Sequence, residues 1–205
     1  WSPATSTFAF PWGEATLTLH DAALIAGLPA TGSPVPAPLQ PEWRPDEAAL
    51  NGVRLGFNRS ACKKAHLSAW IKHFLTDHND TVLEHAAFLA LWLTRFVLSG
   101  QPESTMRQAV FPIAVRLARG ERVALAPAVL ASLYRDLRDI KAFLVAAGAA
   151  ATTGNADMLS SLSLYSPLYI LHLWIWERFP ALRPGRENPQ GDGEPMAARW
   201  HDLNR

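Results

Sequence analysis

Residues 67–75 read Leu-Ser-Ala-Trp-Ile-Lys-His-Phe-Leu, and their apolar members recur at the spacing of a helix. Five apolar side chains occupy positions i, i+3, i+4, i+7 and i+8, namely Leu67, Trp70, Ile71, Phe74 and Leu75. Residues at these positions share one face of an α-helix, so this face is expected to be buried. The pattern predicts an amphipathic helix over residues 65–78.

Further helices are predicted on both sides of this stretch. Residues 80–98 are apolar on nearly every face, which places them at the centre of a bundle. Pro112 and Pro127 each suit the first turn of a helix, where no backbone N–H is needed. We therefore expect helices at 80–98, 112–120, 127–147 and 167–179, and a weaker one between 155 and 166. The prolines of residues 29–45 and the stretch 148–155 predict loops.

The N-terminal residues carry the signals of a hairpin followed by a short helix. Thr, Phe and Leu alternate on both sides of the turn at 11–14, which predicts a two-stranded hairpin within residues 5–19. Thr18 suits an N-cap, and Asp21 stands where a capping box places its acid. Gly27 suits the end of this helix.

The predicted fold is mainly α: a helical bundle with a small N-terminal β-hairpin. We expect one helical domain over residues 1–182 and a Pro-, Gly- and charge-rich tail over 183–205. Because the chain begins at Trp1 rather than Met, we expect it to be part of a longer protein. The pattern has no βαβ alternation and no repeat.

The net charge, the cysteine count and the length of the apolar runs limit the classes of protein to which the chain can belong. The chain has 205 residues, a net charge of +1 and a single cysteine, Cys62. The weak charge gives no general attraction to nucleic acid or to anionic membranes, and one cysteine excludes an internal disulfide. The longest apolar run, near 86–97, is shorter than the roughly 20 residues that a bilayer requires.

Catalytic motifs are weak. Ser60 and Lys63 match S-x-x-K, but the companion motifs of that enzyme class are missing. His66 and His73 share a helix face, but they are too far apart along it to bind one zinc ion. We therefore expect no catalytic residue, metal or cofactor and predict that the protein is not an enzyme. A cryptic hydrolase stays as an alternative.

The last predicted helix contains charges among aromatic residues. A buried Glu177 requires a cationic partner, and Arg135 or Arg95 could supply it. We expect structural roles for Trp92, Arg95, Arg135, Trp174, Trp176, Glu177, Arg178 and Phe179. We also expect one buried cluster formed by Trp92, Phe96, Leu133, Leu137, Trp174 and Phe179.

Two surfaces are candidates for binding. Trp12, at the hairpin turn beside Glu14, could anchor a protein partner, together with the loop 29–45. The stretch 54–74 has basic residues and no acid, which would suit nucleic acid as the alternative ligand. These basic residues are Arg54, Arg59, Lys63, Lys64 and Lys72.

Residues 7–21 and 174–180 resemble the opening and closing motifs of the plant mobile domain, also called the aminotransferase-like plant mobile domain. Residues 84–97 and 125–137 fit the same family, so the resemblance covers nearly the whole chain. It implies a nuclear protein-interaction domain that acts in transposon silencing and control of gene expression, or a copy carried by a transposable element. It also implies a phosphatase-like nuclear protein as partner. Ala9 and Ala15 depart from the family pattern.

The "aminotransferase-like" label does not imply pyridoxal phosphate here. Such a cofactor needs a Schiff-base lysine and a phosphate cup, normally on an α/β scaffold. The four lysines of this chain follow no buried strand, and no glycine-rich loop leads into a helix. We therefore expect that the domain binds a protein partner without any cofactor.

Overall fold

The computed structural model describes residues 1–59, 64–76, 81–153, 161–185 and 188–201, excluding the side chains of 150–153. The fold is mainly α-helical with one N-terminal hairpin, as the sequence predicts. The chain divides into two compact units. The terminal unit combines Trp1–Leu28 with Ala126–Arg205, and the central unit is Pro29–Leu125. The predicted division at residue 182 stays a prediction.

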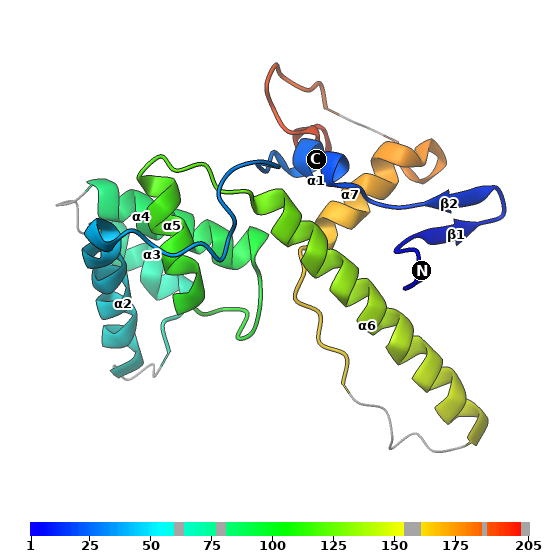
Figure 1. The fold of residues 1–205 in the computed structure, drawn as a ribbon, viewed down its shortest axis with the longest axis horizontal. Helices are drawn as coiled ribbons and strands as arrows, with labels where there is room; N and C mark the ends of the chain where they lie inside the picture. The colour runs from blue at the N-terminus through cyan, green and yellow to red at the C-terminus, as the bar shows by residue number, and fades with distance from the viewer. Residues whose placement is uncertain (60–63, 77–80, 154–160, 186–187, 202–205) are drawn as a thin grey trace. The chain divides into compact units, whose positions relative to one another are not determined.

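The described part of the terminal unit contains the hairpin and the helices α1, α6 and α7 (Figure 1). Strands β1 (Phe8–Phe10) and β2 (Gly13–Ala15) pair antiparallel, with Phe8 opposite Ala15. The helices are α1 (Leu19–Ala26), α6 (Leu125–Thr153, which begins at the last residue of the central unit) and α7 (Leu168–Arg178). Two 3₁₀ helices follow, Pro180–Leu182 and Met196–Trp200. Helix α1 contacts both α7 and the second 3₁₀ helix.

Helix α1 has the two ends that the sequence predicts. The Thr18 hydroxyl accepts the backbone N–H of Asp21, and the Asp21 carboxylate accepts the backbone N–H of Thr18 at 3.0 Å. This reciprocal pair is the capping box, which satisfies two N–H groups that the first turn leaves free. Gly27 ends the helix at φ +64°, a left-handed conformation that favours glycine.

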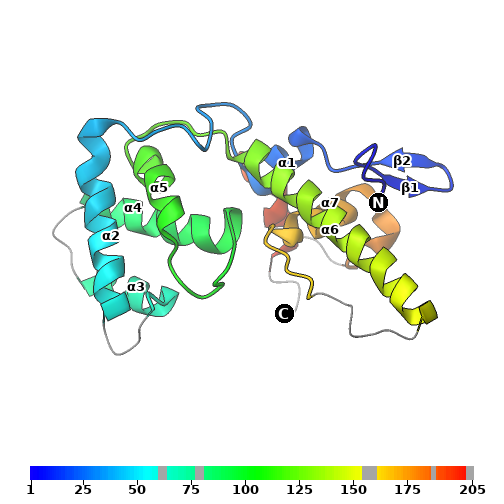
Figure 2. The same ribbon diagram turned by 60° about the horizontal axis from the view of Figure 1, so that its bottom comes forward.

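Within its described residues, the central unit is built from the helices α2, α3, α4 and α5, seen from a second direction in Figure 2. They are α2 (Arg44–Arg59), α3 (Leu67–Thr76), α4 (Thr81–Trp92) and α5 (Phe111–Ala118). A π-helical turn, Leu93–Val97, continues α4, and 3₁₀ turns occupy Pro41–Trp43 and Gln108–Val110. Helix α4 packs against α5, and the Trp70 ring stacks on Phe111 at 5.5 Å between centroids. Both rings are buried, so they form part of the core of this unit.

Five predicted helices are confirmed within a few residues, namely α1, α3, α4 with its π-helical turn, α5 and α7, and three local predictions are wrong. Helix α2 begins at Arg44, where the prolines of residues 29–45 predict a loop, and no helix is predicted for residues 46–59. Pro45 occupies the first turn, where its missing N–H costs nothing. Helix α6 continues through Gly148 to Thr153, since the surrounding alanines favour a helix. Residues 161–165 form no helix; the rest of the predicted weak helix lies largely outside the described residues.

The prediction of one buried cluster of aromatic and leucine side chains is also wrong. Trp92 and Phe96 belong to the central unit, whereas Leu133, Leu137, Trp174 and Phe179 belong to the terminal unit. Leu133, Leu137 and Trp174 are buried, but Phe96 is 50% exposed and the Trp92 and Phe179 side chains are half-buried. The π-helical turn changes the angular spacing of side chains, so that Leu93, Thr94 and Val97 are buried while Phe96 faces outward.

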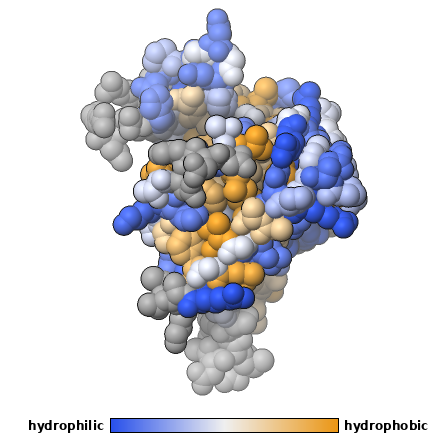
Figure 3. Space-filling view, turned by 90° about the vertical axis from the view of Figure 1, so that its left-hand side faces the viewer, coloured by the Kyte–Doolittle hydropathy of each residue, from blue (hydrophilic) through white to orange (hydrophobic). Residues whose placement is uncertain are grey.

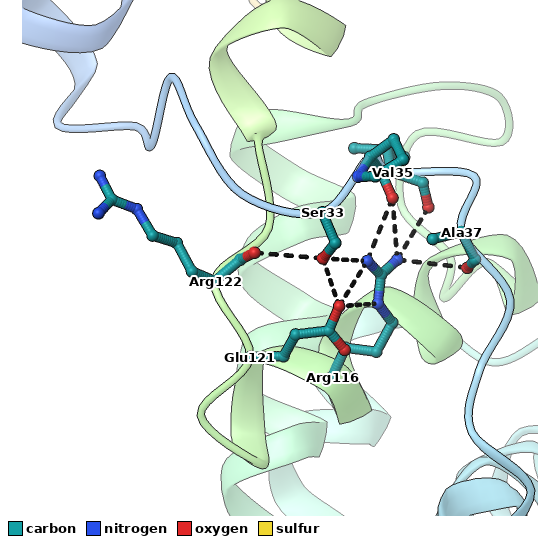
Figure 4. A network of polar contacts seen from close by, with 7 residues as sticks. Ser33, Val35, Ala37, Arg116, Glu121 and Arg122 are labelled. Atoms are coloured by element: carbon teal, nitrogen blue, oxygen red, sulfur yellow. Dashed lines mark hydrogen bonds and ion pairs between the residues drawn. The ribbon is translucent and has the colours of Figure 1, made fainter.

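The proline-rich loop 29–45 is held by a buried arginine on α5. Arg116, 1% exposed, donates hydrogen bonds to the backbone carbonyls of Pro34, Val35 and Ala37 at 3.1–3.3 Å. Its Nε and Nη2 also contact the Glu121 carboxylate at 3.1 and 2.9 Å (Figure 4). A buried charge needs both a counter-ion and filled donors, and this arrangement supplies them. The loop is therefore packed rather than free.

A buried carboxylate on α6 fixes the approach to α7. Asp136 is fully buried, and its Oδ2 accepts the backbone N–H groups of Tyr165 and Ser166, each at 2.6 Å. Arg135 completes the group with a 3.0 Å contact to Oδ1. Hydrogen bonds from backbone N–H groups to an ionised carboxylate are strong. Asp136 therefore ties the start of the last helix to the middle of α6.

Candidate functional site

An open pocket of about 360 Å³ lies beside the hairpin in the terminal unit. Aromatic rings of Trp12, Trp174 and Phe179 form one part of its wall. The hairpin exit and α1 contribute small and polar residues, and α7 contributes Arg178. The pocket therefore joins the two ends of the sequence, residues 12–21 and 174–179, into one feature.

Trp12 is the most exposed aromatic residue of this pocket. It is 66% exposed, and its ring lies parallel to that of Phe10, with the centroids 4.7 Å apart and the planes 6° apart. Phe179 lies 6.3 Å from it, centroid to centroid. The rings behind it hold the indole in place, so little conformational entropy remains to be lost on binding. Exposed, rigid aromatic side chains of this kind often carry much of the energy of a protein interface. Trp12 is therefore exposed at the hairpin turn, and its role as an anchor for a partner stays a prediction.

An ion pair closes the polar side of the pocket. The Arg178 guanidinium contacts the buried Asp21 carboxylate, while its own side chain is 55% exposed. Burial raises the pKa of Asp21, but hydrogen bonds from Arg178 and Thr18 outweigh this effect and hold the pKa below its ordinary value. Asp21 is therefore ionised near neutral pH. Arg178 has five N–H donors, so pairing with Asp21 leaves donors for a ligand.

Glu14 lies on β2 but outside the pocket lining. Its carboxylate accepts a 3.0 Å hydrogen bond from the Thr7 hydroxyl, and its side chain is exposed. Its register partner Ala9 is on the opposite strand. Glu14 therefore links the two arms of the hairpin and offers a negative charge beside Trp12.

Glu177 is buried and paired, but its partner is not the predicted one. Its side chain is 6% exposed; Oε2 contacts Arg199 at 3.2 Å, and Oε1 accepts the Trp200 indole N–H at 2.7 Å. Arg135 instead pairs with Asp136, and Arg95 is exposed on the π-helical turn. The predicted partners did not include Arg199, because residues 183–205 were expected to form a Pro-, Gly- and charge-rich tail.

Two of the predicted basic residues that the structure describes line one pocket, and two others do not. Arg54 and Lys64 line an open pocket in the central unit, whereas Arg59 ends α2 and Lys72 is exposed on α3. Lys63 lies outside the described residues. Arg107 also lines the pocket. It was not among the predicted basic residues, because it lies more than thirty residues after the basic stretch 54–74. Only the folded chain brings it beside Arg54.

A second, apolar groove of about 110 Å³ lies between α3 and α4 of the central unit. Ile71, Leu75 and Phe88 line it and are exposed. The space-filling view in Figure 3 shows apolar side chains grouped among hydrophilic ones on the left-hand side of Figure 1. Exposed apolar groups of this kind are typical of interaction surfaces. None of the described helices is both long and apolar enough to cross a membrane.

Comparisons with known proteins support the family suggested by the sequence motifs. The family model described as "Plant mobile domain" matches residues 1–205. The chain is 26% identical over 215 residues to the Arabidopsis thaliana protein "Serine/threonine-protein phosphatase 7 long form homolog". It is also 26% identical over 214 residues to "Protein MAIN-LIKE 1" of the same plant. No solved structure matches.

The alignments cover nearly all of this chain but only a minor part of each relative. Each alignment includes 98% of this chain, but only 15% of the phosphatase homolog and 37% of the MAIN-LIKE protein. The chain therefore corresponds to one part of each longer relative. Because the family model spans every residue, the identification does not depend on any single motif. This chain belongs to the plant mobile domain family.

Proposed function

We propose that this plant mobile domain works by binding a protein partner and not by turning over a substrate. The observation that carries the proposal is Trp12, which is highly exposed, held by stacked rings and set at the edge of a concave pocket. An aromatic side chain costs free energy when it is left in water, so such a residue suits a docking surface.

The buried carboxylates also fit a binding role better than catalysis. A general acid needs a pKa raised towards neutral pH. Hydrogen bonds instead hold the pKa of Asp21 and Asp136 below the ordinary value, against the opposing effect of burial. Glu177 is engaged by Arg199 and Trp200. Each of these groups stabilises the fold, which supports a structural assignment for all three.

The chemistry of the pocket indicates what the partner presents. The aromatic wall of Trp12, Trp174 and Phe179 favours an apolar side chain. The free donors of Arg178 favour an acidic side chain beside it. We therefore propose a partner segment in which an apolar residue and a carboxylate are neighbours.

The cellular setting is proposed from the family. We propose a nuclear protein that acts in transposon silencing and control of gene expression, or a transposon-derived copy, with a phosphatase-like nuclear protein as partner. One relative's name, "Serine/threonine-protein phosphatase 7 long form homolog", supports the link with phosphatases. The other relative, "Protein MAIN-LIKE 1", supports membership in the same group of plant proteins.

The test compares two exposed aromatic residues. The full chain and its Trp12→Ala and Phe88→Ala variants are mixed with the candidate phosphatase-like protein, and affinity is measured by calorimetry. Phe88 is a matched control because it is similarly exposed but lines the other groove. We expect Trp12→Ala to weaken binding by at least about 30-fold, the scale of an interface hot spot. Loss of binding only in Phe88→Ala would move the docking surface to α3 and α4.

A further inference from the structure

The central unit contains a basic pocket that the hairpin site does not use. It is open, has a volume of about 490 Å³, and is lined by the end of α2, by Lys64–Ala65, by Pro102 and by residues 105–109. Three of its lining residues are cationic, namely Arg54, Lys64 and Arg107, and none of its described lining residues is acidic. Such a pocket concentrates positive potential at one place on a chain whose net charge is only +1.

The backbone around the pocket is fixed by hydrogen bonds between two segments. The N–H of Met106 donates to the carbonyl of Ala65 at 2.8 Å, and the N–H of Leu67 donates to that of Ser104 at 3.0 Å. Asn58 on α2 accepts the N–H of Ala65 at 3.1 Å, which joins α2 to the same segment. The pocket is therefore preorganised, so binding would order little additional chain.

Arg107 is the least satisfied cation of the pocket. Its Nε is buried without a hydrogen-bond partner among the described residues. Burial lowers the pKa of its guanidinium, because the charge loses hydration. No described carboxylate lies within ion-pair distance of it, in contrast to Arg116 and Arg119 of the same unit. Arg107 is half-buried, so its guanidinium loses part of its hydration without gaining a carboxylate partner among the described residues, and an anionic ligand would offset this cost.

The missing side chain of Gly100 leaves room for the Arg107 guanidinium. A Cβ atom on Gly100 would lie 2.5 Å from Nη1 of Arg107, which is closer than any real contact. The Arg54 side chain is held by two hydrogen bonds. Its Nε donates to the side chain of Asn51, and its Nη2 donates to the side chain of Gln108 at 3.1 Å. Arg54 is thus held by hydrogen bonds from two of its guanidinium nitrogens, while Lys64 is exposed and can adjust its position.

We propose that this pocket binds one phosphoryl group, carried by a phosphorylated serine or threonine of a protein partner. Three cations on one concave surface suit a compact dianion. A nucleic acid would require a continuous basic track, and Lys72 and Arg59 lie outside this pocket. The inference rests on the proposed function in one respect, because it assumes a protein ligand. It adds a second site that does not include Trp12.

The test measures binding of a phosphoserine peptide library, its unphosphorylated counterpart, inorganic phosphate and a single-stranded oligonucleotide to the full chain. Lys64→Gln is the main variant, since Lys64 is exposed and its loss leaves the core intact. Arg107→Gln is the second, and Lys72→Gln is the matched control from α3. We expect selective binding of the phosphopeptides, competition by inorganic phosphate, and a loss of about tenfold in Lys64→Gln and in Arg107→Gln.

Other outcomes overturn the proposal in distinct ways. Equal losses in Lys64→Gln and Lys72→Gln, with the oligonucleotide bound most tightly and a steep salt dependence, would indicate nucleic acid. Equal binding of both peptide libraries would show that the pocket does not recognise phosphate. The Trp12→Ala variant separates this inference from the proposal that Trp12 anchors a protein partner. If phosphopeptide binding persists in Trp12→Ala but is lost in Lys64→Gln, it belongs to the basic pocket alone.

Discussion

The indole N–H of Trp200 donates a 2.7 Å hydrogen bond to the Glu177 carboxylate, which joins the second 3₁₀ helix to the last turn of α7. Arg199 adds an ion pair to the same carboxylate. Arg183 supports this end of the helix, since its guanidinium donates to the carbonyls of Trp176 and Glu177 at 2.6 and 3.1 Å. The C-terminal segment therefore satisfies groups that α7 cannot satisfy by itself.

Glu177→Gln tests this junction. The substitution removes the charge that pairs with Arg199, which is itself partly exposed, so we expect a loss of about 1–3 kcal/mol in unfolding free energy. The measurement is chemical denaturation followed by tryptophan fluorescence. Asp139→Asn, an exposed change on α6, serves as control with a shift within about 0.5 kcal/mol. Equal stability of Glu177→Gln and wild type would show that the carboxylate is solvated.

Asp136 predicts a dependence of stability on pH. Burial raises the pKa of Asp136, but hydrogen bonds from Ser166, Tyr165 and Arg135 hold it below the ordinary value. Its ordinary, unfolded pKa is about 3.9. A lowered folded pKa means that the stabilisation is complete above the unfolded pKa and is lost as pH falls through the folded pKa.

We therefore expect Asp136→Asn to cost about 2–4 kcal/mol at pH 7, because two backbone N–H groups lose a charged acceptor. The difference from wild type is expected to shrink as pH falls below about 4. Urea denaturation at a series of pH values measures both quantities. A difference that stays constant down to pH 2 would rule out the ionised carboxylate as its source.

Arg116→Met tests whether the hydrogen bonds from Arg116 hold the proline-rich loop 29–45 in place. The variant leaves three carbonyls and Glu121 without their buried partner, so we expect a loss of about 3–5 kcal/mol and faster proteolysis within residues 29–45. Arg119→Met breaks a more exposed pair with Asp46, and we expect it to cost less than about 1 kcal/mol. Similar stability of the two variants would contradict this role of Arg116.

The parts of the fold that follow from local rules were predictable. The capping box at Thr18, the glycine stop at Gly27 and the helical spacing of α3 depend on neighbours within a few residues, and all three are present. The apolar face of α3 was predicted to be buried, but Ile71 and Leu75 are exposed. Helix α2 was missed for a local reason too, since Pro45 can either end a helix or begin one. The hairpin turn also placed Trp12 correctly as an exposed residue.

The polar contacts over long sequence distances could not be predicted. Arg116 reaches carbonyls about eighty residues away, and backbone carbonyls carry no signature in the side-chain sequence. Arg178 pairs with Asp21 across 157 residues, so neither one marks the other in the sequence. Arg107 joins Arg54 in one pocket for the same reason. The candidate anchor was therefore predictable, whereas the pockets around the candidate residues required the fold.

Trp174 lies at the base of the hairpin pocket and tests how far that pocket depends on the core. It is 2% exposed, and its ring lies 6.0 Å from Phe8 and 5.7 Å from Phe179. We expect Trp174→Ala to cost about 3–5 kcal/mol, since it opens a cavity. Trp174→Phe is expected to cost less, because it keeps ring contacts and removes an indole N–H that has no hydrogen-bond partner among the described residues. Thermal unfolding measures this order, with the exposed Trp12→Ala as the mildest of the three. If Trp12→Ala were as destabilising as Trp174→Ala, Trp12 would be a structural residue, and its role as a partner anchor would fail.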